Sequence, residues 1–208
     1  SARAQMLERS AEDPDGVRRN AQAILRSIRQ MNIMISDLAD SARLEFGGAL
    51  AVRPRTLDLI ALLSEVIERW KETPEGDRIE VRLPDSMPPV CADPDAFERV
   101  LANLMSNALK YSPDEEKITV SAAADEVEAT VSVADRGPGI PPEDAGRLFE
   151  RFFRSESARK HHDGLGLGLT ISRALVEAQD GRIWVETELG RGSVFSFTLP
   201  LSPSNTRS

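Results

Sequence analysis

The chain has 208 residues, 40% hydrophobic and 29% charged, with a formal net charge of −8; this composition indicates one medium-sized or two small globular domains, and the acidity argues against non-specific nucleic-acid binding. The single cysteine, Cys91, excludes an internal disulfide framework and is compatible with a reducing compartment. No apolar run reaches the ~18 residues of a membrane span and no signal peptide is visible, so we expect a cytoplasmic segment without membrane contact, although the parent chain could be membrane-anchored.

Residues 1–50 are dominated by a heptad pattern. Apolar residues recur at alternating spacings of four and three, at Val17, Ala21, Ile24, Ile28, Met31, Ile35, Leu38 and Ala42, with Leu25 and Met34 beside them. The pattern predicts a helix from Asp13-Pro14 to about Gly47, because Asp and Pro favour helix starts and Gly favours helix ends. The wide apolar stripe is typical of a four-helix bundle, so we expect a homodimer through this helix. The alternative is an N-terminal helix that packs only on the following domain.

The segment before this helix is short. Residues 1–13 supply only about three helical turns, whereas the predicted helix of about 30 residues is a rod of about 45 Å. We therefore expect residues 1–50 to be part of a helical hairpin whose first helix lies mostly outside this chain. Such a hairpin fragment would serve dimerisation.

Residues 53–201 mix predicted helices and strands, and residues 202–208 are expected to form a disordered tail. Helices are predicted over 56–71, 94–111 and 169–179, and strands over 79–83, 118–122, 127–133, 183–187 and 193–199. The elements alternate without strict βαβ repeats. This order predicts an α+β domain, a two-layer α/β sandwich with a mixed sheet and helices on one face.

The stretch NLMSNALKY, residues 103–111, places polar side chains on a core helix. Asn103, Asn107 and Lys110 share one helical face, because they are separated by four and three residues. Amide oxygens suit Mg²⁺, and a lysine suits a phosphate. A buried amide without a partner costs about 2 kcal/mol or more. The alternative is therefore that both asparagines are hydrogen-bonded within the core or face water.

Two glycine-rich segments follow. In DRGPGI, residues 135–140, Asp135 comes directly after a strand and could accept a hydrogen bond from an adenine amino group, while glycines permit close approach of a ligand. In DGLGLGL, residues 163–169, alternating glycines open a helix, which favours phosphate binding by backbone N–H groups. The spacing fits neither a P-loop nor a dinucleotide fingerprint. The alternatives are an ordinary Asp-Gly turn and a flexible linker, although three leucines make the second segment apolar for a linker.

The segment LFERFFRSESARKHHDG, residues 148–164, lies between these loops. It combines three phenylalanines with several arginines and a lysine in an otherwise acidic chain. A basic segment that ends at a phosphate-type loop indicates a mobile lid over a ligand.

Taken in order, these motifs resemble the catalytic and ATP-binding domain of sensor histidine kinases, within the wider GHKL superfamily. NLMSNALKYS resembles the N box, DRGPGI the G1 box, LFERFFR the F box, GLGLGL the G2 box, and GRIWVETELGRGSVFSFTLP the C-terminal signature. The match covers about residues 53–201. The heptad region resembles the second helix of the family's dimerisation and histidine-phosphotransfer domain.

The resemblance implies a site for ATP and Mg²⁺ between the sheet and the lid. Asn107 matches the asparagine that binds Mg²⁺, and Asn103 matches its supporting neighbour. Lys110 matches a phosphate-contacting lysine, Tyr111 an aromatic residue beside adenine, and Asp135 the carboxylate that reads the adenine amino group. The remaining residues implied in cofactor binding are Gly137, Gly139, Ile140, Phe149, Gly164, Leu165, Gly166, Leu167 and Gly168.

The resemblance also implies which residues take part in the reaction. The catalytic candidates are Asn103, Lys110 and Arg151, with Arg151 near the γ-phosphate. ATP-hydrolysing relatives typically carry glutamate at the Asn103 position as general base, and asparagine cannot accept that proton. We therefore expect poor hydrolysis and transfer of the γ-phosphoryl group to a histidine on the first bundle helix. From there it would pass to an aspartate of a response-regulator receiver domain.

The chain departs from the family pattern in one respect. Its only histidines, His161 and His162, fall in the predicted lid and lack the sequence context of a phosphoacceptor. We expect the acceptor to lie outside this chain and the chain alone not to autophosphorylate. Two rival interpretations remain: a serine kinase of the anti-sigma-factor type, which usually lacks a long heptad helix, and a degenerate ATP-binding adaptor, against which the intact nucleotide boxes argue.

Overall fold

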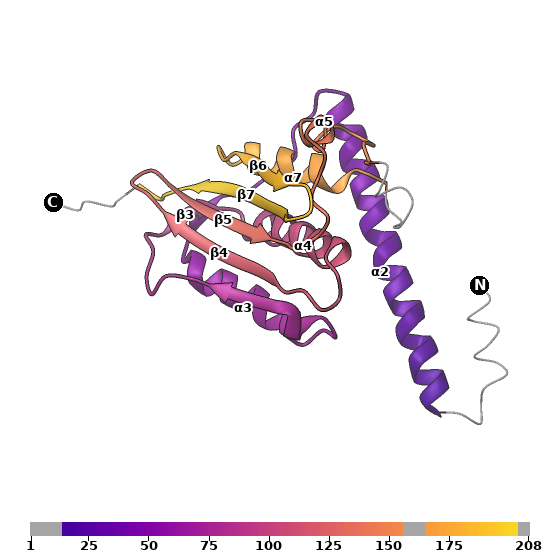
Figure 1. The fold of residues 1–208 in the computed structure, drawn as a ribbon. Helices are drawn as coiled ribbons and strands as arrows, with labels where there is room; N and C mark the ends of the chain where they lie inside the picture. Colours follow the sequence, from indigo (N-terminus) through magenta and orange to yellow (C-terminus); the bar gives the residue numbers. More distant parts are fainter. Residues whose placement is uncertain (1–13, 156–164, 204–208) are drawn as a thin grey trace.

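The structure, a computed structural model, describes residues 14–155 and 165–203 and is built around a five-stranded mixed sheet (Figure 1). The strand order is β2-β4-β5-β7-β6, in which β2 and β4 are parallel and all other neighbours are antiparallel. The strands are β2 Ile79–Arg82, β4 Ile118–Ala124, β5 Glu128–Ala134, β6 Ile183–Glu188 and β7 Gly192–Pro200. A separate antiparallel pair joins β1 Arg55–Leu57 to β3 Val90–Ala92.

The two faces of the sheet differ in character. Val131 and Val133 of β5 are buried and lie opposite Phe197 and Phe195 of β7, so these alternate positions form the core face. On the other face Ser132 and Ser196 lie opposite each other, with their hydroxyl oxygens 2.8 Å apart. The period of two in the sequence therefore assigned the core face correctly.

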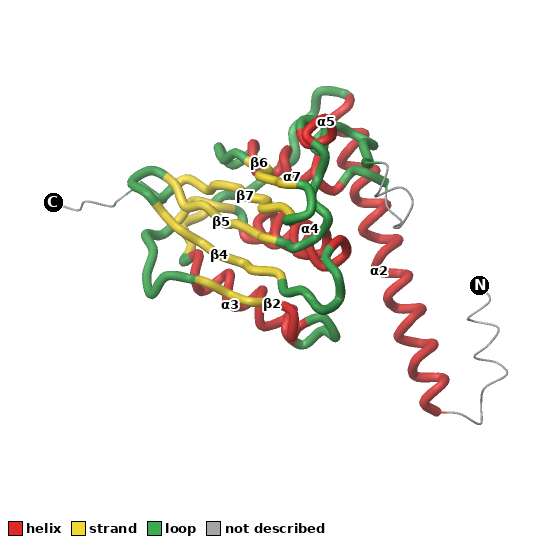
Figure 2. Tube along the Cα trace, viewed as in Figure 1, coloured by secondary structure: helices red, strands yellow, loops and turns green. Residues whose placement is uncertain are grey.

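Helices cover the core face of the sheet (Figure 2). They are α3 Leu59–Lys71, α4 Pro94–Tyr111 and α7 Gly168–Glu177; a 3-10 turn, η1 Gly76–Arg78, and a short helix, α5 Pro142–Ala145, lie in the connections. Helix α4 begins as predicted, because the Asp93 side chain accepts hydrogen bonds from the N–H groups of Asp95 and Ala96 and Pro94 takes the first helical position. The predicted two-layer α+β fold is confirmed.

Helix α2, Pro14–Glu45, is the predicted heptad helix, and its N-terminal half stands clear of the domain (Figure 1). Its C-terminal end is closed by N–H groups of Gly47 and Gly48, which donate to the carbonyls of Leu44 and Arg43, with Gly47 at φ +75°. No helix in the described ranges is both long and apolar enough to cross a membrane. The predicted N-cap Asp13, the rest of residues 1–13 and most of the predicted tail lie outside the described residues.

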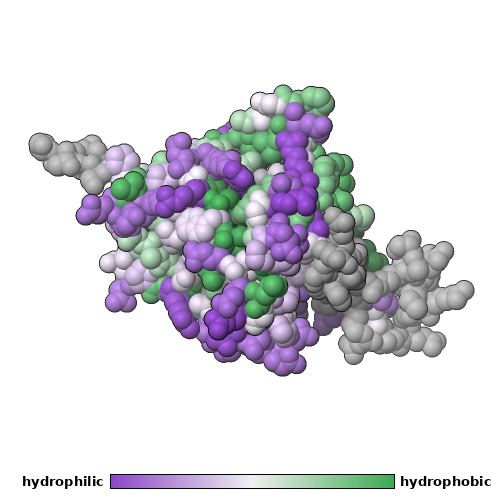
Figure 3. All heavy atoms as spheres, turned by 45° about the horizontal axis from the view of Figure 1, so that its top comes forward, coloured by the Kyte–Doolittle hydropathy of each residue, from purple (hydrophilic) through white to green (hydrophobic). Residues whose placement is uncertain are grey.

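Most of the exposed large apolar side chains of the described residues lie on α2. They include Leu25, Ile28, Met31, Ile33, Ile35 and Leu38, which are 43–66% exposed. Elsewhere, hydrophilic residues cover much of the visible surface and hydrophobic areas lie between them (Figure 3). The apolar stripe of α2 is thus available to another helix, and the homodimer stays a prediction.

The predicted helix over 56–71 is wrong at its start. Thr56 and Leu57 belong to β1, and Asp58 is the N-cap of α3, with its side chain accepting from the N–H of Ala61 at 3.0 Å. The cap fixes the helix start, because a residue that bonds N–H groups with its side chain adopts an extended backbone. The partner strand β3 was not predicted. The other boundaries shift by three residues or fewer.

Candidate functional site

The side chain of Asn103, a residue of α4, lies against α7. Its Nδ2 donates a 2.9 Å hydrogen bond to Oγ of Ser172, a buried residue of α7. Helix α7 comes so close that a Cβ at Gly168 would be 2.4 Å from Asn103 Oδ1. The amide nitrogen of Asn103 therefore has the internal partner that the alternative interpretation required, whereas its oxygen points toward the first residue of α7.

Asn107 lies one turn further along α4 and is half-buried. Within the described residues the structure gives its carboxamide no hydrogen-bond partner. Lys110 follows on the same face, with its Nζ 5.4 Å from the ring centroid of Tyr111. An amide oxygen that makes no internal hydrogen bond is suited to bind a hard cation such as Mg²⁺.

The other end of α4 meets the loop after β5. The Gly137 N–H donates to Asp135 Oδ1 at 2.8 Å, and a Cβ at position 137 would be 2.8 Å from the carbonyl oxygen of Tyr111. Burial raises the pKa of Asp135, although hydrogen bonds from backbone N–H groups partly offset this. A partly buried carboxylate with an oxygen left over can accept a hydrogen bond from a ligand.

A hydroxyl pair supports this loop from β6 and β7. Thr187 Oγ1 accepts from the Ile140 N–H at 2.9 Å and lies 2.9 Å from Ser193 Oγ, while the Asp135 N–H donates to the Ser193 carbonyl at 2.8 Å. Gly139, at φ +69°, packs so tightly that a Cβ there would be 2.2 Å from the Glu188 carbonyl oxygen. The strand ends therefore fix the backbone around Asp135.

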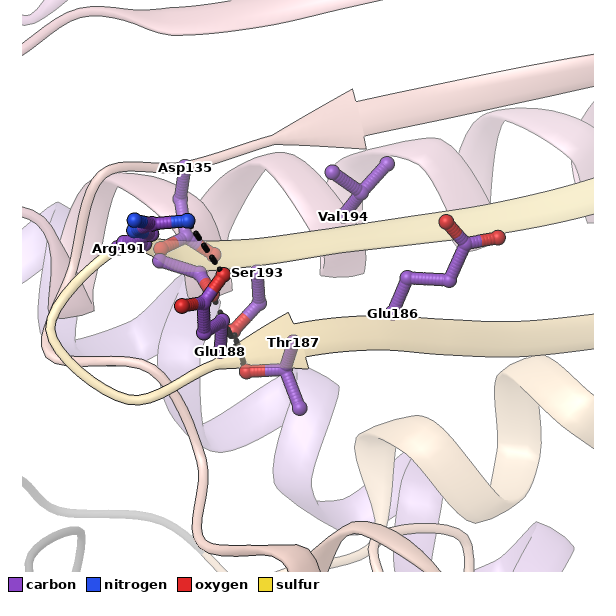
Figure 4. Close-up of a pocket in the computed structure, with 8 residues that line it drawn as sticks. Asp135, Glu186, Thr187, Glu188, Arg191, Ser193 and Val194 are labelled. Carbon is purple, nitrogen blue, oxygen red and sulfur yellow. Dashed lines mark hydrogen bonds and ion pairs between the residues drawn. The ribbon is translucent and has the colours of Figure 1, made fainter.

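An open pocket of about 340 Å³ lies at these strand ends (Figure 4). Asp135, Thr187 and Ser193 are among its lining residues, and the turn between β6 and β7 forms its rim. Asn103 and Asn107 do not line this pocket. Glu186 and Val194 also line it, and they alternate with the core-facing Val185 and Phe195. The pocket therefore includes Asp135 but extends onto the face of the sheet opposite the helices.

The glycine-rich loop before α7 contacts the phenylalanine-rich segment. The Phe152 N–H donates to the Gly166 carbonyl at 3.0 Å, and Thr170 Oγ1 donates to the Phe149 carbonyl at 3.1 Å. Leu167 is buried and Leu165 is exposed, whereas Gly164 lies outside the described residues. Arg151 belongs to the same segment and is half-buried, and its catalytic role stays a prediction.

Helix α4 thus connects two groups of predicted residues. Asn103 contacts Gly168 at the start of α7, and Tyr111 contacts Gly137 beside Asp135. The two positions on α4 are separated by about 12 Å along the helix axis. Leu167, the N-cap of α7, makes no side-chain cap hydrogen bond in the described part of the chain, so the first N–H groups of this helix are suited to an anion. The arrangement can hold an elongated ligand with a hydrogen-bonding ring at one end and negative charge at the other.

Three residues of this arrangement were missed in the sequence: Ser172, Thr187 and Ser193. Ser193 and Thr187 carried a usable signal, since they are polar residues at core-facing positions of strands next to a Gly-Arg-Gly turn. Ser172 carried a weaker one, as a serine among the buried residues Ile171, Leu175 and Val176 of α7.

The fold is that of an ATPase-type domain. The sequence profile of the histidine kinase-, DNA gyrase B- and HSP90-like ATPase family matches residues 92–203, more than half of the chain. The chain belongs to this family, which confirms the resemblance drawn from the sequence motifs.

Two similar proteins carry names that include a sensory kinase and a sensor-like histidine kinase. The chain is 34% identical over 179 residues to the adaptive-response sensory kinase SasA of Synechococcus elongatus, covering 84% of this chain and 45% of SasA. It is 36% identical over 200 residues to the sensor-like histidine kinase SenX3 of Mycobacterium tuberculosis, covering 95% of this chain and 48% of SenX3. The chain therefore spans about half the length of the curated relatives it matches.

A solved structure shows the same fold with a nucleotide analogue. Full-length ShkA in complex with AMPPNP superposes with a TM-score of 0.72 at 28% identity, covering 91% of this chain and 40% of ShkA.

Proposed function

We propose that this chain is the ATP-binding catalytic portion of a two-component sensor histidine kinase. It binds ATP with Mg²⁺ and transfers the γ-phosphoryl group to a histidine on the first helix of the dimerisation bundle, outside this chain. The observation that carries the proposal is the placement of α4, which presents Asn103 beside the N-terminus of α7 and Tyr111 beside Gly137, next to Asp135.

The adenine would lie at the Asp135 end. The Asp135 carboxylate accepts a hydrogen bond from the exocyclic amino group of the adenine. Its Oδ1 also accepts a hydrogen bond from the Gly137 N–H, which holds the carboxylate in place. Gly139 and Ile140 line the ring through their backbone, which Thr187 holds in place. Tyr111 covers one side of the ring.

The triphosphate would lie along α4 toward α7. Asn107 supplies an amide oxygen to Mg²⁺, which neutralises the charge that develops during phosphoryl transfer. The ammonium group of Lys110 neutralises more of the phosphate charge, as a point charge. The N–H groups of Gly166, Leu167 and Gly168 and the positive end of α7 bind the phosphate oxygens. Arg151 and Phe149 belong to the segment that closes over them.

Asn103 directs the reaction away from hydrolysis. A carboxamide cannot take a proton from an attacking water, and its Nδ2 is already bonded to Ser172. Positioning and electrostatic stabilisation then favour whichever nucleophile is presented in line with the γ-phosphoryl group. We propose that this nucleophile is the histidine of the bundle.

The partners follow from the same proposal. The exposed apolar side chains of α2 would pair with a second copy of the chain to form the bundle. The phosphorylated histidine would then be read by a response-regulator receiver domain. We place this segment in the cytoplasm, where ATP and receiver domains are found.

Radioactive labelling tests the phosphotransfer. A chain extended upstream by the first bundle helix should acquire acid-labile, base-stable phosphate from ATP labelled at the γ position, and the 208-residue chain should not. Acid-labile phosphate on the 208-residue chain would contradict a histidine outside it. Acid-stable phosphate would favour the serine-kinase interpretation, and no label on either chain would favour the adaptor.

A further inference from the structure

We infer that Ser172 is a positioning residue that sets which end of the Asn103 carboxamide faces the metal ion of a bound nucleotide or the water ligands of that ion. The inference rests on the proposed nucleotide site. It assigns a role to a residue of α7 that the nucleotide would not touch.

Ser172 is built into the contact between two helices. It is 2% exposed, and its Oγ accepts the hydrogen bond from Asn103 Nδ2 at 2.9 Å, across 69 positions of sequence. A serine hydroxyl within a helix can donate its own proton to the carbonyl one turn earlier. Such a donation would be compatible with the hydrogen bond that Ser172 Oγ accepts from Asn103 Nδ2.

Gly168 and Ser172 act on the two ends of the same amide. They are four residues apart and therefore share one face of α7, and both lie against Asn103. Ser172 binds the nitrogen, while Gly168 leaves room for the oxygen, since any Cβ there would be 2.4 Å from Oδ1. The oxygen of Asn103 is thereby directed to the uncapped start of α7, next to the proposed phosphate site.

The orientation matters because the two ends of a carboxamide are chemically opposite. Its oxygen can interact with a metal ion or its water ligands, whereas its NH₂ group cannot. Without the Ser172 hydroxyl, Nδ2 loses its partner and the amide can rotate by half a turn. A fraction of the molecules would then present NH₂ to the metal ion and its water ligands, where the amide oxygen is needed.

A double-mutant cycle tests this role. The 208-residue chain is titrated with a fluorescent ATP analogue, once with Mg²⁺ and once with a chelator. Ser172→Ala should weaken the Mg²⁺-dependent affinity about fivefold, the effect of losing one hydrogen bond, and should change the affinity in chelator less. In the Asn103→Ala background the same Ser172→Ala change should have no effect, because Ser172 acts only through Asn103.

Ser196→Ala is the matched control. Ser196 is also a buried serine whose hydroxyl bonds a side chain, Ser132, but it lies on the open face of the sheet. The Ser196→Ala variant should bind nucleotide with the same affinity as the unchanged chain. If Ser172→Ala unfolds the chain, Ser172→Thr and Ser172→Val give the comparison, because these side chains have the same shape and differ in the hydroxyl.

The outcomes separate the inference from the proposed function. Equal affinities of Ser172→Ala and the unchanged chain, or an equal loss with and without Asn103, would overturn the positioning role while leaving the nucleotide site intact. A chain that binds no nucleotide at all would overturn the proposed function and the inference with it.

Discussion

Arg99 of α4 binds Asp40 of α2, with its Nη1 2.6 Å from Oδ2, and its Nη2 lies 2.8 Å from Oδ1 of Asp37. Burial lowers the pKa of Arg99, but the hydrogen bonds to the two carboxylates outweigh it and hold the pKa above its ordinary value. Arg99 stands one turn before Asn103 on the same helix. The ion pairs therefore join the heptad helix directly to the helix that carries the candidate site.

Replacing Arg99 should loosen α2. Arg99→Ala removes two charge-assisted hydrogen bonds, so the free energy of unfolding should fall by about 1–3 kcal/mol, and proteolysis between residues 46 and 53 should accelerate. Arg69→Ala is the control, because Arg69 pairs with Glu65 and Glu98 on an exposed surface and should cost less than ~1 kcal/mol. Identical cleavage rates for the two variants would show that the ion pairs do not anchor α2.

Two glycines with positive φ differ in what surrounds them. Gly139→Ala should lower the free energy of unfolding by about 3 kcal/mol or more, because the left-handed backbone costs 1–2 kcal/mol and its Cβ would be 2.2 Å from the Glu188 carbonyl oxygen. Gly190 has φ +77° and nothing within 4 Å of an added Cβ. Gly190→Ala should therefore lower the free energy of unfolding only by the cost of the left-handed backbone. Chemical denaturation measures both. A similar loss in the two variants would mean that the close approach at Gly139 is readily relieved.

The charged Asp135 carboxylate should lower the free energy of unfolding near neutral pH. Burial raises its pKa above the ordinary 3.8, so the folded state disfavours the charged form. The cost is present above the folded-state pKa and disappears as the pH falls below 3.8. Asp135→Asn should therefore melt at a higher temperature than the unchanged chain near neutral pH, with a difference that shrinks on acidification. A lower melting temperature near neutral pH would contradict this sign.

Asp93 should behave in the opposite way. Burial raises its pKa, but hydrogen bonds from the N–H groups of Arg53, Ala96 and Asp95 outweigh it and the pKa is lowered from 3.8. Its contribution to stability is present above 3.8 and is lost as the pH falls through the lowered value. Asp93→Asn should melt below the unchanged chain near neutral pH, and the two should converge in acid. Melting curves across pH test both aspartates together.

Arg78 should contribute to stability, although most arginines lie exposed on protein surfaces. Its side chain is 15% exposed and donates to the carbonyls of Pro113 at 2.7 Å and Glu116 at 3.0 Å, just after α4. Arg78→Ala should lower the free energy of unfolding by about 1–2 kcal/mol, because these carbonyls lose a half-buried, charged donor. The exposed Arg82 is the control, and Arg82→Ala should change stability by less than ~0.5 kcal/mol. Equal effects of the two replacements would contradict this role.

The sequence predicted the features that depend on neighbouring residues. The heptad spacing and Gly47 located α2, and Asp93-Pro94 located the start of α4, because caps and periodicity act within a few residues. The alternation in β5 and β7 identified the core face. The motif order also brought Asp135, Gly137 and Tyr111 to one end of the site and Asn103 and Gly168 to the other.

The remaining features depend on partners far away in the chain. Strand β1 was missed because three residues show no period and its partner β3 lies more than 30 residues away. Nothing near Asn103 in the sequence indicates that Ser172 binds it. Thr187 supports Ile140 only because the β6–β7 hairpin ends beside the loop after β5.

The central claim is that α4 binds a magnesium-bound adenine nucleotide, and calorimetric titration of the 208-residue chain with ATP tests it most directly. The account predicts binding that is tighter with Mg²⁺ than with a chelator, a loss of about tenfold or more in the Mg²⁺-dependent affinity for Asn107→Ala, and no change for Asn32→Ala on the exposed part of α2. Absence of Mg²⁺-dependent binding, or an Asn107→Ala variant that binds as tightly as the unchanged chain, would contradict it.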